Sequence, residues 1–111
     1  MSPFISLIIH TLNEEEYLPN LLADLTKQSF TDFEVLVIDG NSDDKTQDKS
    51  MPYFKKLAGE FSVVDKRNVS YQRNHGASIA QGMYLFFIDA DSRLQKNSLE
   101  KLVKEINDSR Y

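Results

Sequence analysis

Three short, mostly apolar runs constrain the fold of this chain more than any other feature. They span Phe4 to Ile9, Phe33 to Ile38 and Met83 to Ile88, and each stops at a polar or acidic group. The first and last are apolar enough to fit strands that are buried on both faces, as central strands of parallel sheets are. The sequence therefore predicts a sheet whose strands all end at polar residues.

Helical patterns separate these runs. The first helix is predicted to begin at a cap, Thr11 or Asn13, with Glu14 to Glu16 in its first turn, and to end near Gln28. Its apolar stripe is built by Leu18, Leu21, Leu22 and Leu25. Later helices are expected at about 45–57, with a break at Pro52, and at 70–81 and 97–106, with a short edge strand at 61–64.

Strands that alternate with helices form βαβ units and a parallel sheet. The predicted fold class is α/β, a three-layer α/β/α arrangement with an open, mainly parallel sheet in one domain, residues 1–111. Asn13, Asp39, Asp89 and Asp91 each follow the end of a predicted strand. Because ligands bind at that edge of such sheets, these groups are expected to converge on one crevice.

Asp89-Ala90-Asp91 follows the last strand directly. Two carboxylates at the end of a buried strand are costly unless a cation or hydrogen bonds offset their charge, and a hard divalent ion would do so. The competing interpretation is a solvated strand end in which one aspartate caps the next helix.

Composition narrows the function classes. The formal net charge of −4 disfavours nucleic acid as a partner, and the lack of cysteine excludes disulfide and thiolate chemistry. No apolar run is long enough for a transmembrane helix, so we expect a cytoplasmic protein, or one associated with membranes through an acceptor or a missing C-terminal part.

Four motifs in order resemble the nucleotide-sugar-binding half of family 2 glycosyltransferases, which have the GT-A type fold with its Rossmann-like half. The resemblance covers essentially the whole chain. The matching segments are Ile8 to Glu14, Val37 to Thr46, Arg73 to Gly82 and Phe87 to Asp91, the last being the family's Asp-x-Asp motif. Each motif alone is weak, whereas four with this order and spacing make a specific match.

The resemblance implies a role for each matching residue. Asp39 would accept a hydrogen bond from the base, and Arg73 would lie near the nucleotide. Asp89 would lie by the ribose and metal, and Asp91 would ligate Mg²⁺ or Mn²⁺. The base and ribose would be lined by the first loop, Thr11, Leu12, Asn13 and Glu14. The implied donor is a UDP- or GDP-linked sugar.

Other interpretations compete with these roles. Asp39 can be a turn residue, Arg73 a surface residue, and His10, which replaces the family's usual proline, a packed or capping side chain. A calcium-binding loop at Asp39 is rejected, because Asp44 stands where that loop needs glycine. Alternative functions are a haloacid-dehalogenase-like phosphatase, a receiver-type signalling domain and a non-catalytic nucleotide-binding or interaction module.

The sequence offers no persuasive base for an acceptor hydroxyl; Glu14 and His75 are guesses. The family's acceptor-binding half is absent, so we expect a donor-binding domain that is weakly active or inactive on its own. Met83 to Ile88 would then form an unpaired sheet edge, and we expect either self-association there or cover from the last helix.

Overall fold

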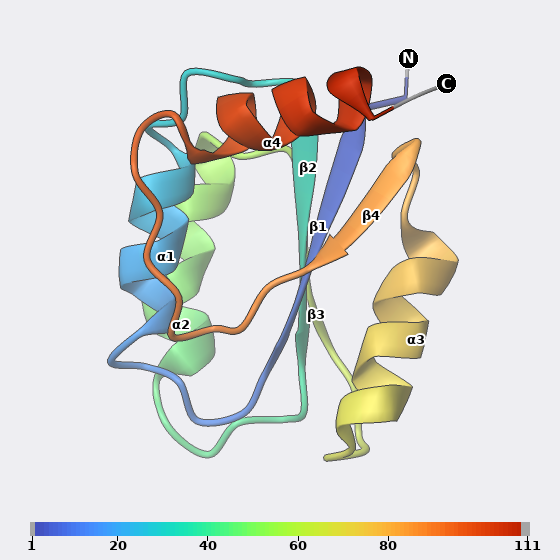
Figure 1. Cartoon of the computed structure of the whole chain (residues 1–111). Helices are drawn as coiled ribbons and strands as arrows, with labels where there is room; N and C mark the ends of the chain where they lie inside the picture. Colours follow the sequence, from blue (N-terminus) through green and yellow to red (C-terminus); the bar gives the residue numbers. More distant parts are fainter. Residues whose placement is uncertain (1, 110–111) are drawn as a thin grey trace.

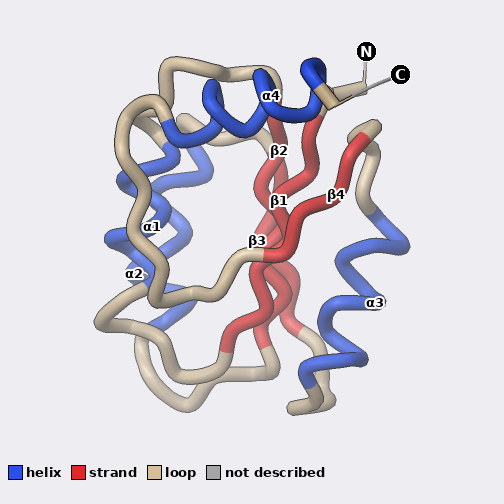
Figure 2. The backbone as a smooth tube through the Cα atoms, viewed as in Figure 1, coloured by secondary structure: helices blue, strands red, loops and turns tan. Residues whose placement is uncertain are grey.

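The computed structural model describes residues 2–109 as a parallel four-stranded sheet between two layers of helices (Figure 1). The strand order is β3-β2-β1-β4, so the predicted parallel α/β fold is confirmed. One face is covered by α1, α2 and α4, and the other by α3 (Figure 2). The elements are β1 (Ile5–Thr11), α1 (Leu18–Leu25), β2 (Phe33–Asp39), α2 (Thr46–Ser50), the 3-10 helix η1 (Met51–Lys55), β3 (Gly59–Val63), α3 (Val69–Ile79), β4 (Tyr84–Phe87) and α4 (Ser98–Asp108).

The main core lies between the sheet and α1. Strand β1 contributes Ile5, Leu7 and Ile9 to it. The helix contributes the predicted stripe of Leu18, Leu21, Leu22 and Leu25, all buried. Because side chains alternate across a strand, the intervening residues of β1 face α3 instead.

Helix α3 lies very close to the other face of the sheet. A Cβ atom added at Gly76 would stand 2.5 Å from Cγ2 of Ile8 and 3.3 Å from Cγ1 of Ile38. The absence of a side chain at Gly76 therefore lets α3 approach the sheet this closely.

Gly82 lies beyond the end of α3 and packs against β1. That helix ends at Ile79, and Ala80 is already extended. A Cβ at Gly82 would lie 2.5 Å from the Ser6 hydroxyl oxygen, which accepts a hydrogen bond from the Gly82 amide at 2.8 Å. The Ser6 hydroxyl in turn donates to the buried carboxylate of Glu34 at 2.6 Å.

The first helix begins later than predicted. Tyr17 is its N-cap and no acidic residue lies in its first turn, so the prediction of Glu14 to Glu16 there was wrong. The amides of Glu14 and Glu15 instead donate to Thr46 and Asp44, in the segment that follows β2. These contacts between two loops replace the first turn of a helix.

The predicted break at Pro52 is confirmed, since α2 gives way to η1 at Met51. Gly59 does not end the helix but opens β3, with a φ of 122°. A Cβ there would stand 1.9 Å from the carbonyl oxygen of Val35, so only glycine fits. Strand β3 lies at the edge of the sheet, as predicted.

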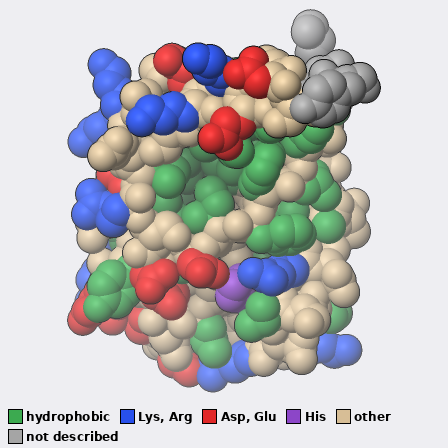
Figure 3. Space-filling view, in the orientation of Figure 1, with side chains coloured by type: hydrophobic (Ala, Val, Ile, Leu, Met, Phe, Trp, Pro, Cys, Tyr) green, Lys and Arg blue, Asp and Glu red, His purple; other side chains and the backbone are tan. Residues whose placement is uncertain are grey.

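Strand β4 is the other edge and pairs with β1. The prediction that it is buried on both faces was wrong, because alternate side chains are exposed: Met83 at 71%, Leu85 at 39% and Phe87 at 45%. Helix α4 lies across one end of the sheet (Figure 1), and these three side chains stay exposed. Apolar side chains gather between α4 and a lower row of charged groups and histidine (Figure 3).

No helix among residues 2–109 combines the length and the apolar character needed to cross a lipid bilayer.

Candidate functional site

A cleft of about 410 Å³ opens at the carboxyl ends of the strands. Strand β1 ends in its middle, with β2 on one side and β4 on the other. The residues that line the cleft are His10, Thr11, Leu12, Glu14, Arg67, Val69, Gln72, Asp89, Ala90 and Asp91. The predicted convergence of the β1 and β4 ends on one crevice is therefore present.

The loops after β1 and β2 hold each other. The Asn13 amide donates to the Ser42 hydroxyl, and the Asp43 amide donates to the Asn13 side-chain oxygen, both at 2.8 Å. Asn13 and Asn41 have φ values of 54° and 64°, a region that asparagine tolerates better than most residues. Asn13 thus joins the two loops and is not itself a lining residue of the cleft.

Asp39 lies at the end of β2 and is only 2% exposed. Its carboxylate accepts from the Ser42 amide at 2.8 Å and from the Ser42 hydroxyl at 2.5 Å. Both of its oxygens are therefore engaged in holding the turn after β2, and Asp39 lies behind the lining of the cleft. The turn role that was weighed for this residue is the one that the geometry displays.

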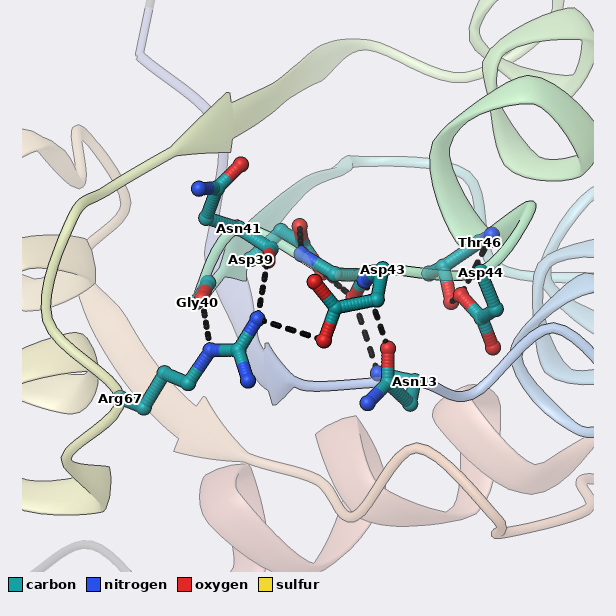
Figure 4. A network of polar contacts seen from close by, with 9 residues as sticks. Asn13, Asp39, Gly40, Asn41, Asp43, Asp44, Thr46 and Arg67 are labelled. Atoms are coloured by element: carbon teal, nitrogen blue, oxygen red, sulfur yellow. Dashed lines mark hydrogen bonds and ion pairs between the residues drawn. The ribbon is translucent and has the colours of Figure 1, made fainter.

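Two anchors from the segment before and inside α3 were missed by the sequence reasoning. Arg67 donates to the carbonyl oxygens of Gly40 at 3.1 Å and Asn41 at 2.7 Å, and it pairs with Asp43 at 2.9 Å (Figure 4). The buried Gln72 side chain donates to the carbonyl oxygens of Thr11 and Ile38. An arginine in a charged turn and a glutamine in a polar helix carry no pattern that marks them in advance.

The β4 side of the cleft is acidic. Asp89 and Asp91 are exposed, and Glu14 lies near enough for the Asp91 carboxylate to affect it. Burial raises the pKa of the Glu14 carboxyl, and the negative charges of Asp91 and Asp44 raise it further. Carboxylate oxygens are the donors that Mg²⁺ and Mn²⁺ prefer, so this wall suits such an ion.

Within residues 2–109, no group of three or more histidine, cysteine, aspartate or glutamate side chains is arranged to hold a metal. Asp89 and Asp91 would therefore supply only part of a coordination shell. Mg²⁺ commonly takes one or two carboxylates and completes its shell with phosphate oxygens and water, so the donor set fits an ion shared with a phosphate ligand.

Arg73 and His10 lie beside this wall. The Arg73 guanidinium is 5.2 Å from the Phe87 ring centroid, a cation–π distance. Its buried Nε has no hydrogen-bond partner among the described residues, and the same holds for the Thr11 hydroxyl. Burial lowers the pKa of His10, Arg73 lowers it further, and Asp89 opposes them.

The model of the family "Glycosyl transferase family 2" matches residues 6–111 of the chain. The chain belongs to this family. Relatives of the chain include a PGL/p-HBAD biosynthesis glycosyltransferase of Mycobacterium bovis, 34% identical over 96 residues. Another is the poly(ribitol-phosphate) beta-N-acetylglucosaminyltransferase TarS of Staphylococcus aureus, 34% identical over 99 residues.

These matches cover most of this family 2 chain and a minor part of each relative. They span 84% of the chain and 37% of the mycobacterial protein, and 86% of the chain and 17% of TarS. Crystal structures agree. TarS residues 1–349 in complex with UDP-GlcNAc superpose with a TM-score of 0.87 at 32% identity, covering 97% of this chain and 32% of that one.

A mannosyltransferase from Pyrobaculum calidifontis, solved in complex with GDP-Man and Mn²⁺, matches with a TM-score of 0.76 at 23% identity. It covers 84% of this chain and 29% of that one, and it supports the likeness of fold alone. The resemblance to GT-A glycosyltransferases predicted from the four motifs is confirmed.

Proposed function

We propose that residues 1–111 form the donor-binding domain of a glycosyltransferase, which binds a nucleoside-diphosphate sugar with Mg²⁺ or Mn²⁺. The observation that carries this proposal is the cleft, in which Thr11, Leu12 and Glu14 from the β1 end meet Asp89 and Asp91 from the β4 end. Such a cleft has a polar and apolar wall for a nucleoside and an acidic wall for a cation.

The nucleoside would lie on the side of β2. Leu12 and Val69 offer apolar surface there, and the buried Thr11 hydroxyl beside them has no hydrogen-bond partner within residues 2–109. Asp39 would position the base indirectly, by holding the turn after β2 through Ser42. If nucleotide binding freed its carboxylate from Ser42, Asp39 would accept a hydrogen bond from the base directly. Asn13 would support the same wall by joining the two loops.

The diphosphate would lie on the side of β4. Asp91, with Asp89 beside it, would hold the ion, which would supply positive charge to offset the negative charge of the departing nucleoside diphosphate. Arg73 would lie near this end, where its guanidinium is not paired with an acid among the described residues. Positive charge there favours the same anionic ligand.

Uridine is the proposed base. TarS, crystallised with UDP and with UDP-GlcNAc, is a relative whose aligned residues are 32–33% identical to those of this chain. We further propose that transfer by this chain alone is slow or absent, because the chain matches only a minor part of each glycosyltransferase that it resembles. A cytoplasmic location remains part of the proposal.

A thermal-shift panel with UDP, GDP, CDP and dTDP, each with and without Mn²⁺, tests the proposal. A ligand that binds only the folded state stabilises it by about 2.7 kcal/mol at a hundredfold excess over Kd. UDP with Mn²⁺ is expected to give the largest shift. Asp91→Asn should remove the part of the shift that depends on Mn²⁺.

The matched control is Asp108→Asn, which removes one exposed carboxylate at the end of α4, away from the cleft. It should shift as the unmodified chain does. Absence of any response to UDP and GDP with Mn²⁺ would favour the non-catalytic interaction module, whereas rapid acceptor-dependent sugar transfer would contradict the expected low activity.

A further inference from the structure

Arg67 precedes α3 and reaches back to the loop after β2 (Figure 4). Its Nε donates to the Gly40 carbonyl oxygen, and its Nη2 donates both to the Asn41 carbonyl oxygen and to the Asp43 carboxylate. The side chain also lies across Gly40, since a Cβ there would stand 3.4 Å from the Arg67 Cγ. One guanidinium therefore holds three residues of this loop, Gly40, Asn41 and Asp43.

The loop that Arg67 holds is itself bonded to the loop after β1. Asp43, the partner of Arg67, donates its amide to the Asn13 side chain. At the start of α2, which follows this loop, the Thr46 hydroxyl accepts from the Glu14 amide at 2.8 Å. The position of Glu14, a lining residue of the cleft, thus depends on a chain of contacts that Arg67 anchors.

Arg67 lies on the side of the cleft next to β2, where it bonds to the loop after that strand. Strands β2 and β4 flank β1 on opposite sides, and no residue of the Gly40–Asp43 loop lines the cleft itself. Arg67, which holds that loop, lines the cleft together with Val69 and Gln72, whereas Asp89 and Asp91 line it from the end of β4. The charge of Arg67 is already paired with Asp43, and two of its nitrogen atoms are bonded to the loop. The hydrogen bonds of this guanidinium therefore order the loop beside the cleft, and few of its N–H groups are available to bind a diphosphate.

We propose that Arg67 is a positioning residue for the nucleoside end of the donor, acting through the Gly40–Asp43 loop that it holds. This inference rests on the proposed function, because it assigns the β2 wall to the nucleoside. A planar guanidinium that donates to two carbonyls and a carboxylate cannot be replaced by the single ammonium group of lysine. Identity at this position, as well as charge, therefore matters.

The experiment compares Arg67→Ala and Arg67→Lys with the unmodified chain, using UDP with Mn²⁺ by calorimetry and uridine by NMR titration. Removing charge-assisted hydrogen bonds that order a binding wall is expected to weaken binding about tenfold. Arg67→Ala should lower the affinities for UDP and for uridine by the same factor. Arg67→Lys should restore neither affinity. The control is Lys66→Ala, which removes the neighbouring charge outside the cleft and should leave both affinities unchanged.

Amide hydrogen exchange supplies a readout that needs no ligand. Arg67→Ala should speed exchange at the Asn13 and Asp43 amides while leaving the strand amides of β1 and β2 protected. If the unmodified chain bound no UDP and Arg67→Ala still showed this exchange pattern, the proposed donor site would be refuted. The anchoring of the Gly40–Asp43 loop by Arg67 would nevertheless stand.

Three results overturn the proposal. They are loss of UDP binding with unchanged uridine binding, full recovery with lysine, and unchanged binding in Arg67→Ala. The first two would make Arg67 a phosphate-contacting charge.

Discussion

Gly76→Ala tests the close packing of α3 on the sheet. The added methyl group would overlap the Ile8 side chain at 2.5 Å and press on Ile38 at 3.3 Å. Both isoleucines are fully buried, so neither can swing away into solvent. Either the helix moves away from the sheet or the two side chains leave their preferred rotamers.

Two effects of opposite sign decide the magnitude. Alanine is preferred to glycine inside a helix by about 1 kcal/mol, which stabilises the variant. Overpacking a dense core costs about 1–3 kcal/mol, and the overlap here is severe enough for the upper part of that range. The net expectation is a loss of about 1–2 kcal/mol, or about 4–8 °C in Tm for a chain of this size.

Urea and thermal unfolding followed by circular dichroism measure this loss. Asn74→Ala is the matched control, because Asn74 is exposed on the same helix and alanine improves helix propensity there without a clash. It should be at least as stable as the unmodified chain. If Gly76→Ala were as stable as Asn74→Ala, the close approach of α3 to Ile8 would be wrong.

Two further predictions concern other parts of the chain. Hydrogen bonds from Arg93 hold the pKa of Asp24 below its ordinary value of 3.8, so the pair contributes stability above that pH and loses it as the pH falls through the lower, folded-state value. Asp24→Asn should therefore lower Tm at pH 7, and its difference in Tm from the unmodified chain should shrink as the pH falls below 3.8. Leu85→Lys places a charge on the open β4 edge and should reduce any concentration-dependent association in analytical ultracentrifugation. A strict monomer before the substitution would contradict self-association at this edge.

Periodicity predicted the sheet well because burial and strand pattern agree along β1 and β2. Every residue of β2 is buried, and β1 is buried except for partial exposure of His10, so their apolar runs report the true environment. Strand β4 broke this rule. Its run is as apolar as that of β1, yet one side faces solvent because no further strand lies beside it within residues 2–109.

The site was harder to foresee. Asp89 and Asp91 could be placed on the cleft because the carboxyl ends of parallel strands meet at one edge. The hydrogen bonds of Asp39 with Ser42, and the anchoring of the same loop by Arg67, depend on side-chain directions that no spacing encodes. The start of α1 was misjudged for the same reason, since amides expected inside a helix bond to a distant loop.

The mutual support of the rim loops has a thermal consequence. Asn13, Asp43 and Arg67 each secure a segment that the others also need, so loosening one removes anchors from the rest. The loops after β1 and β2 should then unfold together as one cooperative unit, at a temperature below that at which the sheet unfolds. On warming, the chain would lose ligand binding while its far-ultraviolet circular dichroism spectrum was still that of the folded protein.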